Sequence, residues 1–266
     1  MSSGPLVSII TIVYNGEKHI ADTLRSVALQ SYRNIEYIIV DGGSTDKTLN
    51  IIRDFGNTVT TLISEKDNGI SDAFNKGIRI ARGTIIGMIN ADDWYAPDAV
   101  EKVVGIMEGY DVAYGDLRLW KDGNTDFIVK GDHGYLGAEM TINHPTVFVR
   151  RECYERFGLF DDRYRCAMDY DLLLRLSVEG CRFIYVPAVL ANMRWGGMSD
   201  VRWRLGCRET MRIKDKYFPG RKLWHRLYYY KQLLAIVVPR LLAWTGLNFI
   251  VRFYRSRFAR VRKIYK

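Results

Sequence analysis

The sequence predicts an α/β fold, a mostly parallel sheet flanked by helices, followed by a basic helical extension. Short apolar runs alternate with segments of helical spacing along the first half of the chain. These runs are apolar on both faces, which is typical of strands that helices cover on both sides. Residues 216–266 contain 13 Lys and Arg and no Asp or Glu, whereas residues 1–215 contain 26 Lys and Arg and 30 Asp and Glu. We therefore expect a main domain over 1–215 and a basic tail over 216–266.

The elements follow in order along the chain. Strands are expected at 6–13, 35–40, 59–63 and 84–89, with helical patterns at 20–28, 45–55, 73–81 and 97–107. Shorter strands are expected at 112–120, 127–129, 146–149 and 182–186, the last of them before Pro187. Helices are expected at 151–157 and 168–178, because a glycine follows each of these apolar patterns.

Polar residues directly follow three of the predicted parallel strands. These stretches are Tyr14-Asn15, Asp41-Gly42-Gly43 and Asn90 to Asp93. Ligands of such sheets bind beyond the carboxyl ends of the strands, so the three stretches predict a single site. The glycines after Asp41 do not form a G-x-G-x-x-G or a P-loop pattern, which disfavours dinucleotide-dependent oxidoreductases and P-loop enzymes.

The stretch "MINADDW", residues 88–94, places carboxylates at the end of a buried strand. Clustered carboxylates beside a low-dielectric core need a cation or must take up protons. Oxygen ligands favour Mg²⁺ or Mn²⁺, and such ions usually serve phosphate groups. A helix cap or a surface turn is the alternative interpretation of the same residues.

Four stretches together resemble the inverting family 2 glycosyltransferases. They are "VSIITIVYNGEKHIADTLRSVALQSYRNIEYIIVDGGSTDKT" (7–48), "DNGISDAFNKGIRIARGTIIGMINADDW" (67–94), "HPTVFVRR" (144–151) and "MDYDLLLRL" (168–176). The resemblance spans roughly residues 7–187. It implies the GT-A fold, a Rossmann-like, mostly parallel sheet flanked by helices. It also implies transfer of a sugar from a nucleotide-diphosphate sugar with the help of a divalent metal ion, Mn²⁺ or Mg²⁺.

The resemblance assigns residues to the nucleotide-sugar site. It implies that Tyr14, with Asn15 beside it, packs by the nucleotide base and that Asp41 hydrogen-bonds this base. Asp72 resembles a residue near the ribose or the diphosphate, and Asp67 is a second candidate there.

The same resemblance places Asn90-Ala91-Asp92 at the D-x-D position of the family. It implies that Asp92 is the principal metal ligand, with Asp93 nearby. Asn90 replaces the first Asp of the motif, so it brings an amide that can contact ribose or metal-bound water but no charge.

Asp169 matches the second position of the E-D motif, which implies that it is the general base. Met168 stands where the preceding acid would be, and a cap of the following helix is the alternative role of Asp169. Asp171 lies two residues further on and cannot share a helix face with Asp169. Asp171 and His144 are kept as acceptor-side candidates, although a lone histidine such as His144 is more often structural.

The segment "RWGGMSD", residues 194–200, resembles a flexible segment that follows the core in relatives. The resemblance implies that Arg194 and Trp195 cover the diphosphate and the sugar, while the glycines permit motion. Ala191 stands where processive synthases have the Gln of Q-x-x-R-W, which favours transfer of a single residue.

The basic tail has two amphipathic patterns, one ending near Pro239 and one over 247–265. The second divides basic from apolar and aromatic residues, which favours in-plane or re-entrant attachment to an anionic membrane. Nucleic acid is the rival partner of a basic segment, but the apolar faces argue against it. Arg240 beside Pro239 disfavours an unbroken membrane span.

The sequence therefore predicts a metal-dependent inverting glycosyltransferase, attached peripherally to the cytoplasmic face of the cell membrane. A UDP-sugar is the expected donor, because Asp41 suits uracil, and a lipid-linked saccharide of surface-glycan assembly is the expected acceptor. Two alternatives remain. One is a nucleotidyltransferase acting on sugar phosphates, whose G-x-G-T/S-R loop is not found near the N-terminus. The other is a non-catalytic, membrane-attached module that binds sugar nucleotides.

Overall fold

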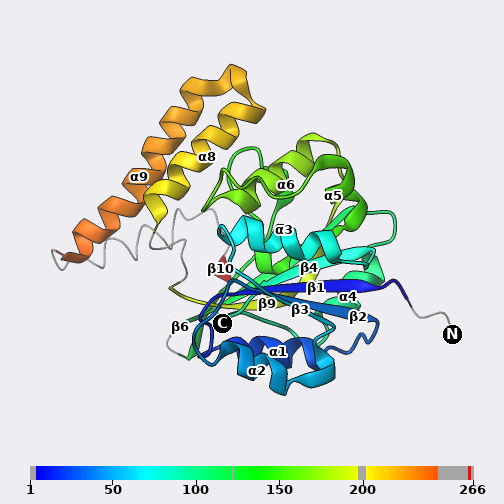
Figure 1. The fold of residues 1–266 in the computed structure, drawn as a ribbon. Helices are drawn as coiled ribbons and strands as arrows, with labels where there is room; N and C mark the ends of the chain where they lie inside the picture. The colour runs from blue at the N-terminus through cyan, green and yellow to red at the C-terminus, as the bar shows by residue number, and fades with distance from the viewer. Residues whose placement is uncertain (1–3, 122, 197–201, 245–262, 265–266) are drawn as a thin grey trace.

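A computed structural model describes residues 4–121, 123–196, 202–244 and 263–264. A central sheet carries helices on both faces, and a pair of long C-terminal helices projects from one end (Figure 1). The sheet order is β10-β7-β6-β8-β4-β1-β2-β3, with β9 paired to β5 and β6. The expected α/β architecture is confirmed.

The N-terminal strands form the parallel half of the sheet. They are β1 (Val7–Val13), β2 (Ile35–Asp41), β3 (Thr61–Ser64) and β4 (Ile85–Asn90). In the register of these strands, Val13 of β1 lies beside Asp41 and Ile12 lies beside Asn90. The carboxyl ends of β1, β2 and β4 therefore meet at one edge, as the sequence predicted.

The remaining strands extend the sheet beyond β4 with mostly antiparallel pairings. They are β5 (Trp94–Tyr95), β6 (Val112–Lys121), β7 (Asn124–Val129), β8 (Phe148–Arg150), β9 (Phe183–Arg194) and β10 (Lys263–Ile264). The expectation that the ninth strand stops before Pro187 is wrong. Its pairing with β6 shifts register between Tyr185 and Val189, so Pro187 falls in an irregularity where no ladder hydrogen bond is required of it.

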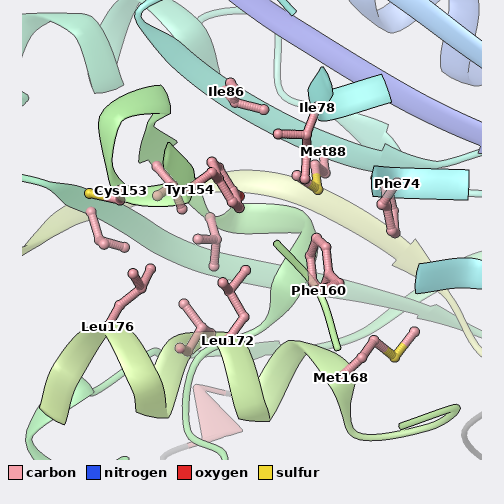
Figure 2. Close-up of a cluster of buried hydrophobic side chains, with 14 of the residues drawn as sticks. Phe74, Ile78, Ile86, Met88, Cys153, Tyr154, Phe160, Met168, Leu172 and Leu176 are labelled. Carbon is pink, nitrogen blue, oxygen red and sulfur yellow. The ribbon is translucent and has the colours of Figure 1, made fainter. Parts of the chain in front are cut away.

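Helices cover the two faces of the sheet with separate apolar cores. On one face lie α1 (Ile20–Ala28), α2 (Thr48–Asp54) and α4 (Ala99–Ile106), and on the other lie α3 (Ile70–Ile80), α5 (Arg151–Phe157) and α6 (Met168–Val178). Four short 3₁₀ turns connect elements: η1 (Gly56–Thr58), η2 (His133–Tyr135), η3 (His144–Thr146) and η4 (Pro219–Arg221). Leu172 and Leu176 of α6 point towards Met88 of β4 and Tyr154 of α5 (Figure 2).

The chain then forms a helical hairpin of α8 (Trp203–Tyr217) and α9 (Lys222–Trp244), of which α8 packs on α6. The expected boundary at 215/216 falls within α8. The expectation that the first tail helix ends near Pro239 is also wrong, because α9 continues past it. Proline removes one helical amide, and Ala235, whose carbonyl would accept from it, is exposed and can be hydrated. Of the second tail helix, expected over 247–265, only Lys263 and Ile264 lie within the described residues, and the expectation is wrong for these two, because they form β10, which pairs with β7.

No helix in the described part of the chain is both long enough and apolar enough to cross a membrane.

Gly87, in the middle of β4, gives a test of this packing. A Cβ at this position would lie 2.5 Å from Phe148 Cε1 and 3.0 Å from Ile9 Cδ1. We expect Gly87→Ala to lower the free energy of unfolding by about 1–3 kcal/mol, as overpacking does. Urea denaturation measures the change. Gly105→Ala in α4 is the matched control, because a Cβ there meets open space, and it should be neutral or stabilising. Equal stability of both variants would contradict the packing of β4 against β8.

Candidate active site

The loops after β1 and β2 are joined by hydrogen bonds at the carboxyl edge of the sheet. The Asn15 amide donates to Ser44 Oγ (2.8 Å), and the Thr45 amide donates to Asn15 Oδ1 (2.9 Å). Asn15 has a φ of 49°, in the left-handed region that asparagine tolerates. Tyr14, beside it, is 64% exposed, so its ring stands at the rim of the site. Asn15 therefore holds the two loops together, and Tyr14 is left free for a ligand.

Asp41 is fully buried at the end of β2. Its Oδ2 accepts hydrogen bonds from the amides of Gly43 (3.1 Å) and Ser44 (3.0 Å) and from Ser64 Oγ (2.8 Å). In this arrangement the carboxylate shapes the loop and has no exposed surface. Gly42 lets the Asp67 side chain lie close to this loop, because a Cβ at position 42 would be only 2.3 Å from Asp67 Oδ2.

Asp67 and Asp72 organise the loop between β3 and α3. The Gly69 amide donates to Asp67 Oδ1 (2.8 Å), and the Asn68 amide donates to Asp72 Oδ2 (2.9 Å). Lys76 forms an ion pair with Asp72 (3.5 Å). Because Gly42 lies against both Asp67 and the Cβ of Tyr14, the residues predicted for the donor come together from three loops.

The carboxylates after β4 have different environments. Asp93 is 1% exposed and accepts hydrogen bonds from Asn90 Nδ2 and from the Arg194 amide, both at 3.4 Å. Burial and the neighbouring charge of Asp92 raise the pKa of the Asp93 carboxyl well above its usual value. Asp92 is only partly buried, and its carboxylate forms no hydrogen bond or ion pair with any described residue. Asp92 is therefore the accessible carboxylate, and Asp93 lies behind it.

Arg194 provides a fixed positive charge at this edge. Its Nη1 donates to the backbone oxygen of Asp92, its Nη2 lies 2.7 Å from Asp22 Oδ2, and its guanidinium stacks 4.4 Å from the Trp94 ring centroid. The sequence placed Arg194 in a flexible segment, but it ends β9 and is held by these contacts. Trp195 is partly exposed, its amide donates to the Trp120 oxygen (3.0 Å), and the glycine at 197 lies outside the described residues.

The residues present fit a divalent ion only if the ligand supplies most of the oxygens. Among the described residues, no three His, Cys, Asp or Glu side chains cluster as a metal site. Asp92 offers one accessible carboxylate, while Asp93 is turned inward. Mg²⁺ is commonly bound by one or two carboxylates together with substrate phosphates. Asp92 with a diphosphate satisfies that pattern.

Asp169 lies in the first turn of α6 and lines a small cavity of about 10 Å³. Burial raises the pKa of its carboxyl to about 6. The cavity is also lined by Met88, which precedes Asn90 by two residues on β4, and by Phe160 and Leu172 (Figure 2). The predicted base therefore lies next to the strand that carries the predicted metal ligand.

His144 lines the same cavity from η3. Burial lowers its pKa to about 4, so the ring is neutral at pH 7. Its Nε2 is buried without a hydrogen-bond partner among the described residues, and its ring packs 5.1 Å from that of Phe74. These contacts give His144 a largely structural setting.

Asp171 is fully buried on another side of α6. It accepts hydrogen bonds from Lys216 Nζ (2.9 Å) and Tyr217 Oη (3.2 Å), and it lies 3.8 Å from Arg175 Nη2. Asp171 and Asp169 thus face different neighbours, as their spacing predicted. The Asp171 carboxylate ties α6 to α8 and has no exposed surface to offer an acceptor.

Two residues of this region were not found from the sequence. Asp22 of α1 pairs with Arg194, which is 172 positions away, and Glu209 of α8 binds the segment before Asp169. Asp22 lies in the stretch 7–48, but the resemblance assigned it no role, and Glu209 lies outside all four stretches. No local pattern predicts such distant contacts.

Residues 8–168 match the family model described as Glycosyl transferase family 2. The chain belongs to this family. This membership confirms the family that the resemblance implied. The alignment with the PGL/p-HBAD biosynthesis glycosyltransferase of Mycobacterium tuberculosis covers 74% of this chain and 80% of that protein, at 33% identity. The chain spans 60% and 57% of the length of two glycosyltransferases of Rickettsia that it matches at 31% identity.

Two groups of solved structures share the fold of this glycosyltransferase. The mannosyltransferase PcManGT from Pyrobaculum calidifontis, in complex with GDP-Man and Mn²⁺, has a TM-score of 0.66 at 20% identity, over 96% of this chain and 83% of that one. S. aureus TarS 1-349, in complex with UDP-GlcNAc, has a TM-score of 0.65 at 16% identity, over 85% of this chain and 71% of that one. The likeness confirms the expected GT-A fold.

Proposed function

We propose that this glycosyltransferase moves one sugar, with inversion, from a nucleotide-diphosphate sugar to an acceptor hydroxyl. The observation that carries the proposal is that two carboxylates both lie beside β4. Asp92 follows β4, and Asp169 shares a cavity with Met88 of the same strand. One carboxylate would serve the leaving diphosphate, and the other would serve the attacking hydroxyl.

The chemistry follows from these positions. Asp92 would hold Mg²⁺ or Mn²⁺ together with the donor diphosphate, and such an ion supplies Lewis-acid stabilisation of the charge on the leaving group. Arg194, fixed against Asp92, adds positive charge at the same edge. On the opposite face of the sugar, Asp169 would accept the proton of the acceptor hydroxyl as this oxygen attacks.

The donor is proposed to be a UDP-sugar. Tyr14 stands at the rim, and Asp41 orders the backbone of Gly43 and Ser44 beside it. TarS is described with UDP-GlcNAc, and PcManGT with GDP-Man, so the family fold accepts both nucleobases. A nucleotidyltransferase or a non-catalytic binding module would differ in the assay, because neither would transfer sugar to an acceptor.

The acceptor is proposed to be a lipid-linked saccharide, reached from the cytoplasmic face of a membrane by peripheral attachment. The outer face of α9 supports the attachment. From Trp224 onward its exposed apolar side chains recur every three or four residues, and with Leu223 they are between 42% and 71% exposed: Leu223, Trp224, Leu227, Tyr230, Leu234, Val238 and Leu241. The charged residues Lys222, Arg226 and Lys231 flank this apolar face. An in-plane helix at an anionic membrane has this division of residues.

A recess beside the hairpin supports the lipid-linked acceptor. It has a volume of about 950 Å³ and lies between segment 134–138 and the α8–α9 pair. Lys214, Arg221 and Lys231 line it together with aromatic side chains, Trp224 and Leu227 of the α9 face also border it, and no carboxylate of the described residues lines it. Positive charge beside apolar surface suits a phosphate-linked lipid.

The base assignment is tested with Asp169→Asn. We expect donor binding to persist and transfer to fall about 10²- to 10⁴-fold, the usual contribution of a general base. A transfer assay and calorimetric titration of the donor measure the two quantities. Turnover at the wild-type rate would exclude Asp169 as the base.

The metal assignment is tested by thermal shift with UDP, with and without Mn²⁺. Mn²⁺ should raise the Tm of the wild-type complex, because a ligand of the native state stabilises it. In Asp92→Asn this increment should be lost. Asp54→Asn, which changes an exposed carboxylate at the end of α2, should keep it. An Mn²⁺ increment that survives in Asp92→Asn would refute the assignment.

Membrane attachment is tested by flotation with liposomes that contain phosphatidylglycerol. Replacing Leu227 and Leu234 together by Glu removes two apolar side chains of about 1.5–3 kcal/mol each, so the bound fraction should fall at least about tenfold. Leu29→Glu is the control, since Leu29 is comparably exposed on α1, and it should float as the wild type does. Unchanged flotation of the double variant would exclude the α9 face.

A further inference from the structure

Glu209 is a carboxylate buried in the middle of α8, where it is 3% exposed. Burying a carboxylate is costly unless other groups compensate its charge. In the described part of the chain, its compensation comes from three backbone amides and not from an ion pair. Arg165 donates to Oε1 (3.0 Å), and Cys166 and Ala167 donate to Oε2 (2.8 and 2.9 Å).

These amides belong to the segment that immediately precedes α6. The first amides of a helix have no partner within the helix, and a side chain of the N-cap residue usually satisfies one of them. The N-cap of α6 is Ala167, which has no side chain able to do so. Glu209 instead accepts, from α8, the amide of the N-cap residue Ala167 and the two amides before it, while the Tyr170 amide within the first turn donates to Asp169 Oδ1. The negative charge of Glu209 also suits the positive end of the α6 dipole.

Asp169 is the second residue of the helix that Glu209 anchors. Its own Oδ1 accepts a hydrogen bond from the Tyr170 amide (2.8 Å), so its carboxylate is fixed relative to the first turn of α6. The position of this turn depends in turn on the three amides that Glu209 holds. A shift of about 1 Å in a reacting group can cost roughly 10² in rate.

We propose that Glu209 is a positioning residue for glycosyl transfer, holding the first turn of α6 so that the Asp169 carboxylate stays where the acceptor hydroxyl reacts. The proposal rests on the proposed role of Asp169. Residues 8–168 match the family model, so Glu209 lies outside the matched region.

Because Glu209 carries a carboxylate close to Asp169, the proposal also predicts how the transfer rate depends on pH. The ionisable groups around Asp169 are His144 of η3, Tyr154 of α5, Cys166 before α6, and Glu209 of α8. Burial lowers the pKa of His144 to about 4 and raises the pKa of Tyr154 and Cys166, so these three are neutral near pH 6. Burial raises the pKa of Asp169, and the negative charge of Glu209 raises it further.

The direction of the pH effect follows. A base must be ionised, so transfer by the wild type should fall as pH drops through about 6. Removing the negative charge at position 209 lowers the pKa of Asp169, and the acid limb of the profile should then move to lower pH. A residue that only supported the fold would change Tm and leave this limb in place.

The experiment compares Glu209→Gln with wild type in transfer rate, donor affinity, Tm and pH profile. Gln has one acceptor oxygen in place of two, so at least one of the three amides loses its partner. We expect kcat to fall about 10- to 100-fold, donor affinity to stay within about twofold, and the acid limb to move to lower pH. Glu209→Asp keeps the charge with a shorter reach, so its kcat should be intermediate and its acid limb that of the wild type. This second variant carries the test if Glu209→Gln does not fold.

Tyr217→Phe is the matched control, because it weakens the α6–α8 contact through Asp171 without touching these amides. It should lower Tm and leave both kcat and the acid limb unchanged. The proposal is overturned if Glu209→Gln keeps the wild-type kcat and acid limb, or if Tyr217→Phe reproduces its effects at equal loss of Tm. Either result with an inactive Asp169→Asn would refute only the role of Glu209, whereas an active Asp169→Asn would refute the base itself.

Discussion

The register of three buried parallel strands is the constraint on which the site depends. Val13 lies beside Asp41 and Ile12 beside Asn90, so β1, β2 and β4 end at the same level. Successive β1 residues enter different cores, Ile9 on one face of the sheet and Ile10 on the other. A slip of one residue would reverse both. The apolar packing that fixes the register therefore also fixes where the polar loops meet, although it contributes no chemistry itself.

That convergence brings negative charge together, and the structure compensates each carboxylate differently. Backbone amides and a hydroxyl satisfy Asp41, a raised pKa accompanies the burial of Asp93, and Arg194 pairs with Asp22. Asp92 has no such compensation among the described residues. Of the two carboxylates in "MINADDW", Asp93 is thus accommodated within the protein, and Asp92, the proposed metal ligand, is the one left accessible.

How much the sequence could predict depends on the range of the interactions involved. The strands β1 to β4, their meeting edge, and the start of α6 at Met168 follow from local apolar patterns and from a topological rule, and all of them were predicted. The environment of each carboxylate was not predicted, because it depends on partners that are distant in the sequence, such as Ser64 for Asp41 and Arg194 for Asp93. Pro187 and Pro239 were misread as stops for a related reason. Pro187 lies where the β9–β6 pairing shifts register, and Pro239 lies in α9 with the carbonyl residue Ala235 exposed, so neither missing amide ends its element.

The helical hairpin shows that the prediction of domain boundaries from local sequence has the same limit. Charge composition divides the chain at 215/216, yet α8 crosses this position and contacts α6 through both Glu209 and Lys216. These two contacts act at neighbouring points of α6, one before its first turn and one at Asp171 within it. The inner helix of the hairpin, α8, is therefore held by hydrogen bonds to α6 and to the segment before it, and α6 is the helix that carries Asp169. The outer helix, α9, packs on α8 and turns its apolar face outward. If that face attaches to a membrane surface as proposed, α8 is the helix through which attachment would reach Asp169, because α8 contacts both α9 and α6.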